Sequence, residues 1–390
     1  MKSIKWLTAT SALSIVAMAV APAHAQEIRL GVHTTLSGPA SAWGQAMLGA
    51  AELAAEDVNS KGGLEVAGRK YKLIVTSYDD NYKANDAVTA MNRLISDDKI
   101  RFVVGPLGSA PALAVLPMTS ESKVITMTMA FTPKALDKNF PYSFRPVIST
   151  EEFSAPQVGW VVKKLNTKRV GGLFPNDESG QQIALANAKA YEQAGANFDA
   201  REFFERERVD FVPLLTRLFA KNIDTIELNG NSPTTAGLIV KQAREMGFKG
   251  PIIRTGGDAT ADIIKVAGAA NAEGLYVHQT INPADPKVAE YIKRYTDRYR
   301  NDMNAFSPMF YANVQVLFAA MQAAGTTTDV DKIRDAMTAG SGFETVIGKV
   351  NWTGEQRYGI KRQIDAPFYI GQIRNGKSVI VARCGAKGCD

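Results

Sequence analysis

Few side chains of this 390-residue sequence have the types and spacing that catalysis requires. Of the three histidines, only His33 and His278 lie beyond the first 25 residues. The H-E-x-x-H pattern of zinc proteases and the G-x-S-x-G turn of serine hydrolases are both missing. So are the Walker loop that binds nucleotide phosphates and the G-x-G-x-x-G loop that binds dinucleotides. The sequence therefore predicts a protein that is not an enzyme and that needs no cofactor or metal.

Two other residues have the chemistry to bind a small solute. Ser109 stands where a strand ends and a helix begins, so its hydroxyl lies beside free backbone N–H groups that together can hold a carboxylate. Trp43 offers a large flat face for apolar burial or for stacking. Taken alone, Ser109 is better explained as a helix N-cap, and for Trp43 a place in the core is the alternative.

The only two cysteines, Cys384 and Cys389, stand in a Cys-Gly-Ala-Lys-Gly-Cys segment at the C-terminal end. Their spacing differs from that of a C-x-x-C redox motif, and two thiolates without matched histidines make a poor zinc site. Outside the cytosol a disulfide is the favoured state of such a pair. We therefore expect a Cys384–Cys389 disulfide that closes a small loop and fixes the tail.

The first 25 residues have the pattern of a secretory signal peptide. Two lysines form a short basic start, a mostly apolar stretch runs over residues 7–20, and Ala23-His24-Ala25 supplies small residues at the cut. The alternative is a buried N-terminal helix. Cleavage after Ala25 predicts a protein free in an exported compartment, most simply a bacterial periplasm.

Composition narrows the class further. The net charge of +6 comes from 45 basic and 39 acidic residues scattered along the chain, so we expect no nucleic-acid partner. No stretch reaches the roughly 18 consecutive apolar residues that a membrane-spanning helix needs. At about 150 residues per domain, the length fits two domains.

Short β-like runs alternate with amphipathic helical runs along the rest of the chain. The first half predicts strands at 27–35, 71–78, 101–104 and 124–129, and helices at 42–59, 85–96 and 110–121. The alternation restarts with strands at 170–174, 225–228, 252–254 and 275–278, and with helices at 180–194, 211–220, 235–246, 286–301 and 309–324. Such alternation predicts parallel sheets covered by helices on both faces. With a late hairpin around Asn375-Gly376, the pattern indicates a bilobed α/β protein whose lobes are joined by short crossing strands.

An ordered series of short segments extends over essentially all of the chain beyond residue 25. It comprises Leu36-Ser37-Gly38-Pro39, Trp43-Gly44, Gly49-Ala50-Ala51-Glu52, the segment 57–63, Tyr78-Asp79-Asp80, the segment 102–106 with Ser109, Ala130-Phe131-Thr132-Pro133, Phe144-Arg145-Pro146, Gln242-Ala243-Arg244 with Gly247, Ala272-Glu273-Gly274-Leu275 and Tyr311-Ala312. Each piece is weak by itself, but the order is specific. The series resembles the leucine/isoleucine/valine-binding type of periplasmic solute receptor, which serves ABC importers.

The resemblance implies two similar doubly wound lobes joined by three crossovers, with a ligand cleft between them. Lobe 1 would take residues 26–148 and 279–355, and lobe 2 residues 149–278 and 356–390. Members of the family catalyse nothing. They close on a small solute by hinge motion and present it to a membrane permease driven by cytoplasmic ATPases, and they act by default as monomers.

The resemblance also implies contacts for the solute in lobe 1. Ser109 and Thr132 match the residues that hold a carboxylate, and the carbonyl of Ala130 matches one that accepts from an amino group. Trp43 stands where the family often places a tyrosine against the ligand side chain. Phe131 would add a second aromatic wall or pack behind the loop.

Lobe 2 departs from the amino-acid-binding pattern. Ser179 and Asn231 stand where aromatic residues are expected, which makes that side of the cleft more polar or roomier. Asp258 is the best match for the acidic partner of an α-ammonium, and a buried carboxylate without such a partner is costly. The alternative is that Asp258 caps the following helix, in which case the ligand need not carry an amine.

The sequence thus predicts a periplasmic binding protein for an amino acid, branched-chain or related, that presents it to ABC permease subunits. Within the same fold, an aromatic carboxylate is the main alternative, because of Trp43, Phe131 and the two departures in lobe 2. An amide or urea solute is a third option. A cytoplasmic ligand-sensing regulator of the same fold is disfavoured by the signal peptide.

Overall fold

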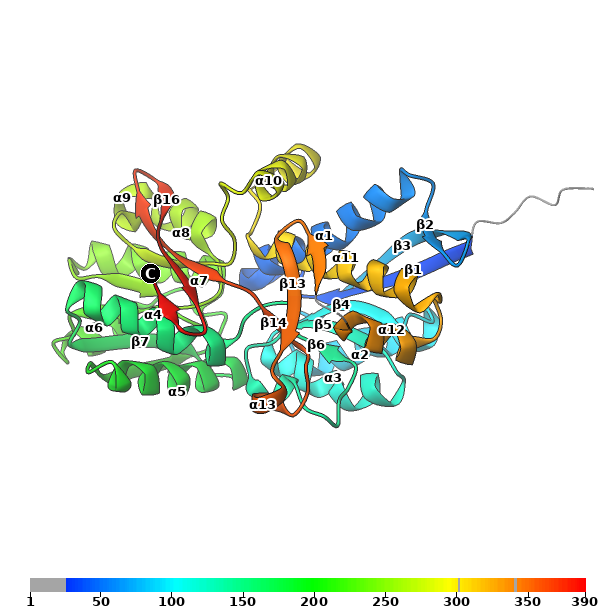
Figure 1. Ribbon diagram of the computed structural model, residues 1–390. Coiled ribbons are helices and arrows are strands. Elements are labelled where there is room, and N and C mark those ends of the chain that lie inside the picture. Colours follow the sequence, from blue (N-terminus) through cyan, green and yellow to red (C-terminus); the bar gives the residue numbers. More distant parts are fainter. Residues whose placement is uncertain (1–25, 301, 340–341) are drawn as a thin grey trace, which may run out of the picture.

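The computed structural model describes residues 26–300, 302–339 and 342–390, so the expected signal peptide lies outside the described residues. Two α/β lobes lie side by side, and a small third sheet stands between them (Figure 1). We call lobe 1 the part built on the six-stranded sheet and lobe 2 the part built on the eight-stranded sheet. The predicted α/β class with two lobes is confirmed, while the residue boundaries between the lobes stay a prediction.

Lobe 1 is built on a sheet with the order β2-β3-β1-β4-β5-β6. The strands are β1 (Gln26–Thr34), β2 (Leu64–Val66), β3 (Arg69–Asp79), β4 (Phe102–Leu107), β5 (Ile125–Met129) and β6 (Ser143–Phe144). Only β2 pairs antiparallel, so the carboxyl ends of β1, β3, β4 and β5 meet at one edge of the sheet.

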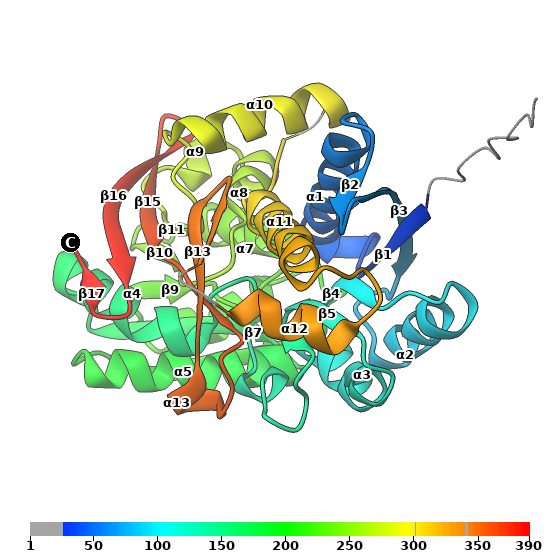
Figure 2. The same ribbon diagram turned by 45° about the vertical axis from the view of Figure 1, so that its right-hand side comes forward.

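The helices of lobe 1 come from both halves of the chain. They are α1 (Ser41–Asn59), α2 (Ala84–Asn92), α3 (Ser109–Glu121), α10 (Pro286–Tyr299), α11 (Phe306–Ala324) and α12 (Val330–Thr338), with short helical turns η1 (Gly38–Ala40), η2 (Arg93–Asp97) and η3 (Pro133–Ala135). Helix α1 packs on the late helix α11, which lies beside it in Figure 2. Buried Leu30, Val32, Met47 and Leu317 belong to one apolar core that joins β1 to these two helices.

Lobe 2 repeats the arrangement. Its sheet has the order β17-β16-β15-β11-β10-β9-β7-β8, with β7 (Arg169–Pro175), β8 (Asn197–Phe204), β9 (Thr225–Glu227), β10 (Ile252–Arg254), β11 (Tyr276–Gln279), β15 (Phe368–Arg374), β16 (Lys377–Gly385) and β17 (Gly388–Cys389). Its helices are α4 (Thr150–Leu165), α5 (Glu178–Gln193), α6 (Val212–Phe219), α7 (Pro233–Glu245), α8 (Thr260–Ala267) and α9 (Ala269–Ala272). Strands β7 to β11 pair parallel, and the last three strands add an antiparallel edge.

The third sheet has the order β12-β13-β14, from β12 (Phe343–Thr345), β13 (Gly348–Thr353) and β14 (Gln363–Asp365), with α13 (Glu355–Tyr358) between the last two strands. In Figure 1 these elements stand between the two lobes. The chain passes from one large sheet to the other after β6, after β11 and after β14. An isolated bridge between Arg145 and Gln363 pairs the first of these crossing segments with the third.

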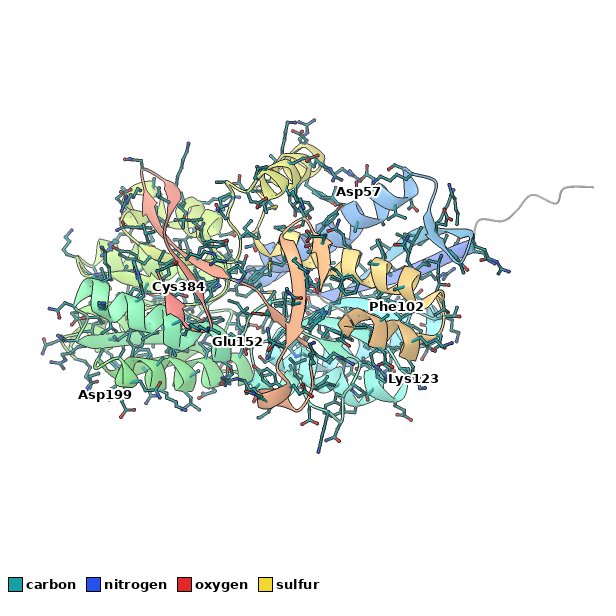
Figure 3. All side chains as sticks on the ribbon, in the orientation of Figure 1. Asp57, Phe102, Lys123, Glu152, Asp199 and Cys384 are labelled. Carbon is teal, nitrogen blue, oxygen red and sulfur yellow. A yellow bond between two sulfur atoms is a disulfide. The ribbon has the colours of Figure 1, made fainter. Side chains whose placement is uncertain are left out.

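The late hairpin is confirmed, with Asn375 and Gly376 at its turn in left-handed conformations. At its far end Cys384 and Cys389 form the predicted disulfide, which joins β16 to β17. Figure 3 shows Cys384 in lobe 2, on the opposite side of the molecule from Asp57 and Phe102 of lobe 1.

Helix α4 has no counterpart among the elements predicted from the sequence. It begins with a capping box, in which the Glu152 carboxylate accepts from the backbone N–H of Ser149 at 2.9 Å and the Ser149 hydroxyl accepts from that of Glu151 at 3.3 Å. Pro156 lies inside the helix, and a proline in a helical pattern usually marks a helix end. The predicted helix at 85–96 is only partly α-helical. Helix α2 ends at Asn92, and the next turn, Arg93–Asp97, has π geometry.

No helix among the described residues is long and apolar enough to cross a membrane. Within the same ranges, no group of three or more histidine, cysteine or acidic side chains is placed to hold a metal ion.

Candidate functional site

The loops that follow the parallel strands of the two lobes meet across a cleft. In open α/β sheets, ligands bind outside the carboxyl ends of the strands, where successive connections leave in opposite directions. A small cavity of about 20 Å³ lies there, and its walls come from both lobes: Trp43, Tyr82, Leu107, Gly108, Met129 and Phe131, with Ser179, Ile183, Gly230 and Arg254. Wider hollows of about 740 and 980 Å³ lie elsewhere, along α4 and beside the crossing segments, but they are open surface grooves.

The structure brings two of the predicted carboxylate ligands together. Ser109 is the first residue of α3, and its hydroxyl accepts a hydrogen bond from the backbone N–H of Thr132 at 3.3 Å. The backbone N–H of Ser109 donates across the cleft to the hydroxyl of Ser179 at 3.2 Å. Gly108 makes this junction possible, because its φ is +94° and a Cβ there would lie 2.6 Å from the ring of Tyr82. Two N–H groups of lobe 1 and the hydroxyls of Ser109 and Ser179 therefore meet at the start of α3, next to the cavity wall at Gly108.

The predicted ammonium acceptor, the carbonyl of Ala130, already has a partner. The guanidinium of Arg145 donates through Nη1 to this oxygen at 3.1 Å and to the carbonyl of Thr132 at 2.8 Å. Nε of the same side chain donates to Oε1 of Gln363 at 2.6 Å. A carbonyl oxygen has a second lone pair, but a guanidinium this close disfavours a cationic group beside it.

The two predicted aromatic residues are both walls of the cavity. Trp43 is 4% exposed, and its Nε1 donates to the backbone carbonyl of Asp258 at 2.7 Å, across the cleft. The ring of Phe131 packs edge-on against Phe153 of lobe 2, with ring centres 5.7 Å apart. Phe131 is thus in contact with lobe 2 as well as with the cavity.

Ser179, one of the departures from the family pattern, also lines the cavity. Its hydroxyl lies 3.3 Å from the hydroxyl of Tyr82, a residue that the sequence analysis did not select. Arg206 lies over the Tyr82 ring at 4.1 Å, donates to its hydroxyl at 3.4 Å and forms an ion pair with Asp177. Burial raises the pKa of Tyr82, so the phenol stays a neutral donor. Tyr82 of lobe 1 and Arg206 of lobe 2 thereby close one side of the cleft.

Asn231, the second departure, points into lobe 2 and is not among the residues that line the cavity. Its Nδ2 donates to the carbonyls of Leu173 and Leu228 at 2.8 and 2.9 Å. The backbone carbonyl of Asn231 accepts from Nη2 of Arg254 at 2.8 Å. Asn231 therefore reaches the cavity only through Arg254, which, like Tyr82 and Arg206, was not predicted from the sequence.

The side chain of Asp258 turns towards α8. Its Oδ1 accepts from the backbone N–H of Thr260 at 3.3 Å. Its backbone carbonyl accepts from Nε1 of Trp43 and, at 3.1 Å, from the side-chain amide of Asn304. Burial raises the pKa of Asp258 to about 7, because little solvent remains to stabilise the charged form. The carboxyl group is buried beside the cleft, where both a helix-capping role and an ammonium-binding role are open to it.

The residues missed from the sequence, Tyr82, Arg206 and Arg254, are polar or charged side chains at strand ends or in loops. Arg254 carried the clearest signal, because an arginine closed the buried strand 252–254 where an apolar residue was expected.

The sequence and the fold are both similar to those of known proteins. The leucine-specific-binding protein of Salmonella typhimurium is 26% identical over 344 residues, which are 87% of this chain and 90% of that protein. A leucine binding protein of Thermotoga maritima has the same fold, with a TM-score of 0.80 at 23% identity over 92% of this chain and 99% of that one. A solute binding protein of an ABC transporter from R. palustris, solved in complex with benzoate, gives a TM-score of 0.79 at 18% identity over 93% and 97% of the two chains. The family model described as periplasmic binding protein matches residues 27–378, so this chain belongs to the periplasmic binding protein family.

Proposed function

We propose that this protein captures a compact carboxylate solute between its lobes and delivers it to the permease of an ABC importer in the inner membrane, where cytoplasmic ATPases drive uptake. One observation carries the proposal: a cavity of about 20 Å³ is closed by side chains of both lobes, and Trp43 and Ser109 bond directly to the opposite lobe. A solute of several heavy atoms exceeds this volume. The walls must therefore separate to admit it and return to bury it, which is a hinge motion at the three crossing segments.

The leading solute is an amino acid, branched-chain or related, as the names of the relatives suggest. In this assignment Ser109 and Thr132 hold the carboxylate, and the Ala130 carbonyl and Asp258 take the ammonium. Trp43 and Phe131 contact the side chain, and Ser179 with Asn231 shapes the far wall. The protein would act as a monomer in the periplasm after cleavage behind Ala25, and it would release the solute chemically unchanged.

An aromatic carboxylate is the second candidate, and two observations favour it. Trp43 and Phe131 both line the cavity, so a flat ring would find aromatic faces there. Arg145 occupies the Ala130 carbonyl at 3.1 Å, which makes this end of the site unfavourable for an ammonium group.

The proposal is tested by thermal unfolding of residues 26–390, refolded beforehand to remove any solute carried through purification. The panel contains aliphatic and polar L-amino acids, benzoate-type acids, and short amides including urea. A solute that binds only the folded state at 100 times its Kd stabilises it by about 2.7 kcal/mol. A raised Tm with one class supports the proposal and names the class, whereas an unchanged Tm across the panel contradicts it. Mass spectrometry of the released solute tests the absence of chemistry.

Asp258→Asn separates the two candidates. If Asp258 binds an ammonium, amino-acid affinity should fall about 100-fold in the variant, because a charged partner is lost in a buried site. Affinity for a plain carboxylate should hold or improve. Asp262→Asn is the matched control, since Asp262 lies in the first turn of α8, the helix that follows Asp258, and its side chain is more exposed.

A further inference from the structure

A buried guanidinium forms part of the cavity wall. Arg254 closes strand β10 of lobe 2, is 1% exposed and lines the cavity beside Ser179 and Gly230. It is one of the largest side chains that the fold buries completely. A charge this deeply buried is unfavourable unless hydrogen bonds and an opposite charge compensate it.

Backbone carbonyls of lobe 2 supply part of that compensation. Nε donates to the carbonyl of Gly257, Nη1 to that of Leu228 at 3.3 Å, and Nη2 to that of Asn231 at 2.8 Å. These bonds hold the guanidinium plane in one orientation. A guanidinium has five N–H donors, so one N–H on each terminal nitrogen remains for another acceptor.

No acid is in direct contact with this guanidinium among the described residues. None of the ion pairs formed among the described residues includes Arg254. The two acids whose charges influence it most are Asp258 and Glu227, and neither of them forms an ion pair with it. No acidic residue lines the cavity itself.

The free side of the guanidinium lies next to the aromatic walls. A Cβ placed on Gly257 would lie 3.2 Å from Nη2 of Arg254, 3.7 Å from the ring of Phe131 and 3.8 Å from the ring of Trp43. Because residue 257 is a glycine, this point is left without a side chain. Nη2 therefore borders the space where the two aromatic rings converge.

The other lobe has hydrogen-bond donors next to the cavity wall. Ser109 follows the wall residue Gly108 and Thr132 follows the wall residue Phe131, and in the closed structure their N–H groups donate to the hydroxyls of Ser179 and Ser109. A cavity with donors beside it in lobe 1, a cation from lobe 2 and no acid in its lining is complementary to a molecule with negative charge at two positions.

We propose that Arg254 binds a second acid group of the solute, so that the protein selects dicarboxylates, acidic amino acids included, over monoacids of the same shape. The inference rests on the proposed function, because the first acid group is the one held at Ser109 and Thr132. Arg254 is thus a specificity-determining residue, and the two N–H groups left by its carbonyl contacts are the donors to the second acid.

The test compares pairs of solutes in which a terminal methyl is replaced by a carboxylate: L-norvaline with L-glutamate, pentanoate with glutarate, and 4-methylbenzoate with terephthalate. Calorimetric titration of the wild-type protein should give tighter binding to the diacid by at least 10-fold in the pair whose shape fits. Equal or tighter binding of the monoacid in every pair that binds overturns the inference and leaves the proposed function standing. No binding of any of the six overturns the inference, while the proposed function is decided by the wider panel described above.

Three variants assign the preference to the residue. Arg254→Met should lower diacid affinity about 100-fold while monoacid affinity changes little, and Arg254→Lys should retain part of the preference, since it keeps the charge and loses the fork. Arg244→Met is the matched control, because Arg244 donates to the carbonyls of Phe248 and Gly250 in the same lobe and lies outside the cavity. A diacid preference that survives in folded Arg254→Met contradicts the assignment. Should that variant fail to fold, the wild-type pairs and Arg254→Lys still decide.

Discussion

The indole nitrogen of Trp43 donates to the backbone carbonyl of Asp258 at 2.7 Å, and the two residues belong to different lobes. The bond joins helix α1 to the loop before α8, over a separation of 215 residues in the chain. It can exist only while the cleft is closed. It therefore contributes to the free energy of closure and, through it, to the affinity for any solute that the closed cleft encloses.

Trp43→Phe keeps an aromatic face and removes this bond. We expect solute affinity to fall about 10-fold, since a buried hydrogen bond contributes about 1 kcal/mol and a buried carbonyl loses one of its donors. Titration calorimetry measures the change. Trp352→Phe is the control, because Nε1 of Trp352 is buried without a hydrogen-bond partner among the described residues and Trp352 lies outside the cavity. Equal losses in the two variants would show that the cross-lobe bond is unimportant.

Asp258 should make stability depend on pH in an unusual direction. Its pKa is about 7 in the fold and near 4 in an unfolded chain, so the folded state binds the extra proton between these values. The contribution of Asp258 to the free energy of unfolding should therefore fall as pH rises from about 4 to 7, with a slope of up to about 1.4 kcal/mol per pH unit. Asp258→Asn removes this contribution, which urea unfolding at several pH values measures. If the variant has the same dependence of stability on pH as the wild-type protein, the raised pKa of Asp258 is contradicted.

His278 should make the stability depend on pH in the opposite direction to Asp258. Its ring is buried between Phe153 and Phe368, Nδ1 lies 2.8 Å from Oε1 of Gln157, and burial lowers its pKa to about 3. In the unfolded chain the imidazole takes up a proton near pH 6.5, whereas in the folded protein it does so only near pH 3. The contribution of His278 to stability therefore falls as pH drops from about 6.5 towards 3.

In the wild-type protein the contributions of Asp258 and His278 offset each other between about pH 4 and 6.5. His278→Asn should therefore leave a stability that falls with rising pH, whereas Asp258→Asn should leave one that rises. If the two variants have parallel profiles over this range, one of the two buried groups is assigned wrongly.

Arg145 connects the solute-binding loop to a crossing segment. Arg145→Met leaves the carbonyls of Ala130 and Thr132 and the amide of Gln363 without their donor, so we expect a loss of about 3 kcal/mol in stability and a loss of solute affinity. Arg362→Met is the control, since Arg362 is also buried near the crossing, but its side chain donates to the carbonyls of Pro141 and Lys361 and to none in the solute-binding loop. Urea unfolding and calorimetry should show a stability loss in both variants and an affinity loss in Arg145→Met alone.

Local patterns in the sequence determined much of the fold. The strand at 252–254 was predicted with the bounds of β10, and the helix at 309–324 lies within α11, because hydrophobic periodicity is a property of neighbouring residues. The disulfide followed from the identity and spacing of two residues, Cys384 and Cys389. Ser109 was placed at a strand-to-helix junction on the same basis, and the structure has it there.

The tertiary structure alone decided which polar groups face each other. Arg145 donates to the Ala130 carbonyl, 15 residues away in the chain, and to Gln363, 218 residues away. The hydroxyls of Tyr82 and Ser179 are in contact across a separation of 97 residues. Arg254 became part of the site because three carbonyls turn its guanidinium towards the cavity. Such contacts depend on how the two lobes close on each other. A one-dimensional pattern fixes which elements form, and the packing of those elements fixes which side chains meet.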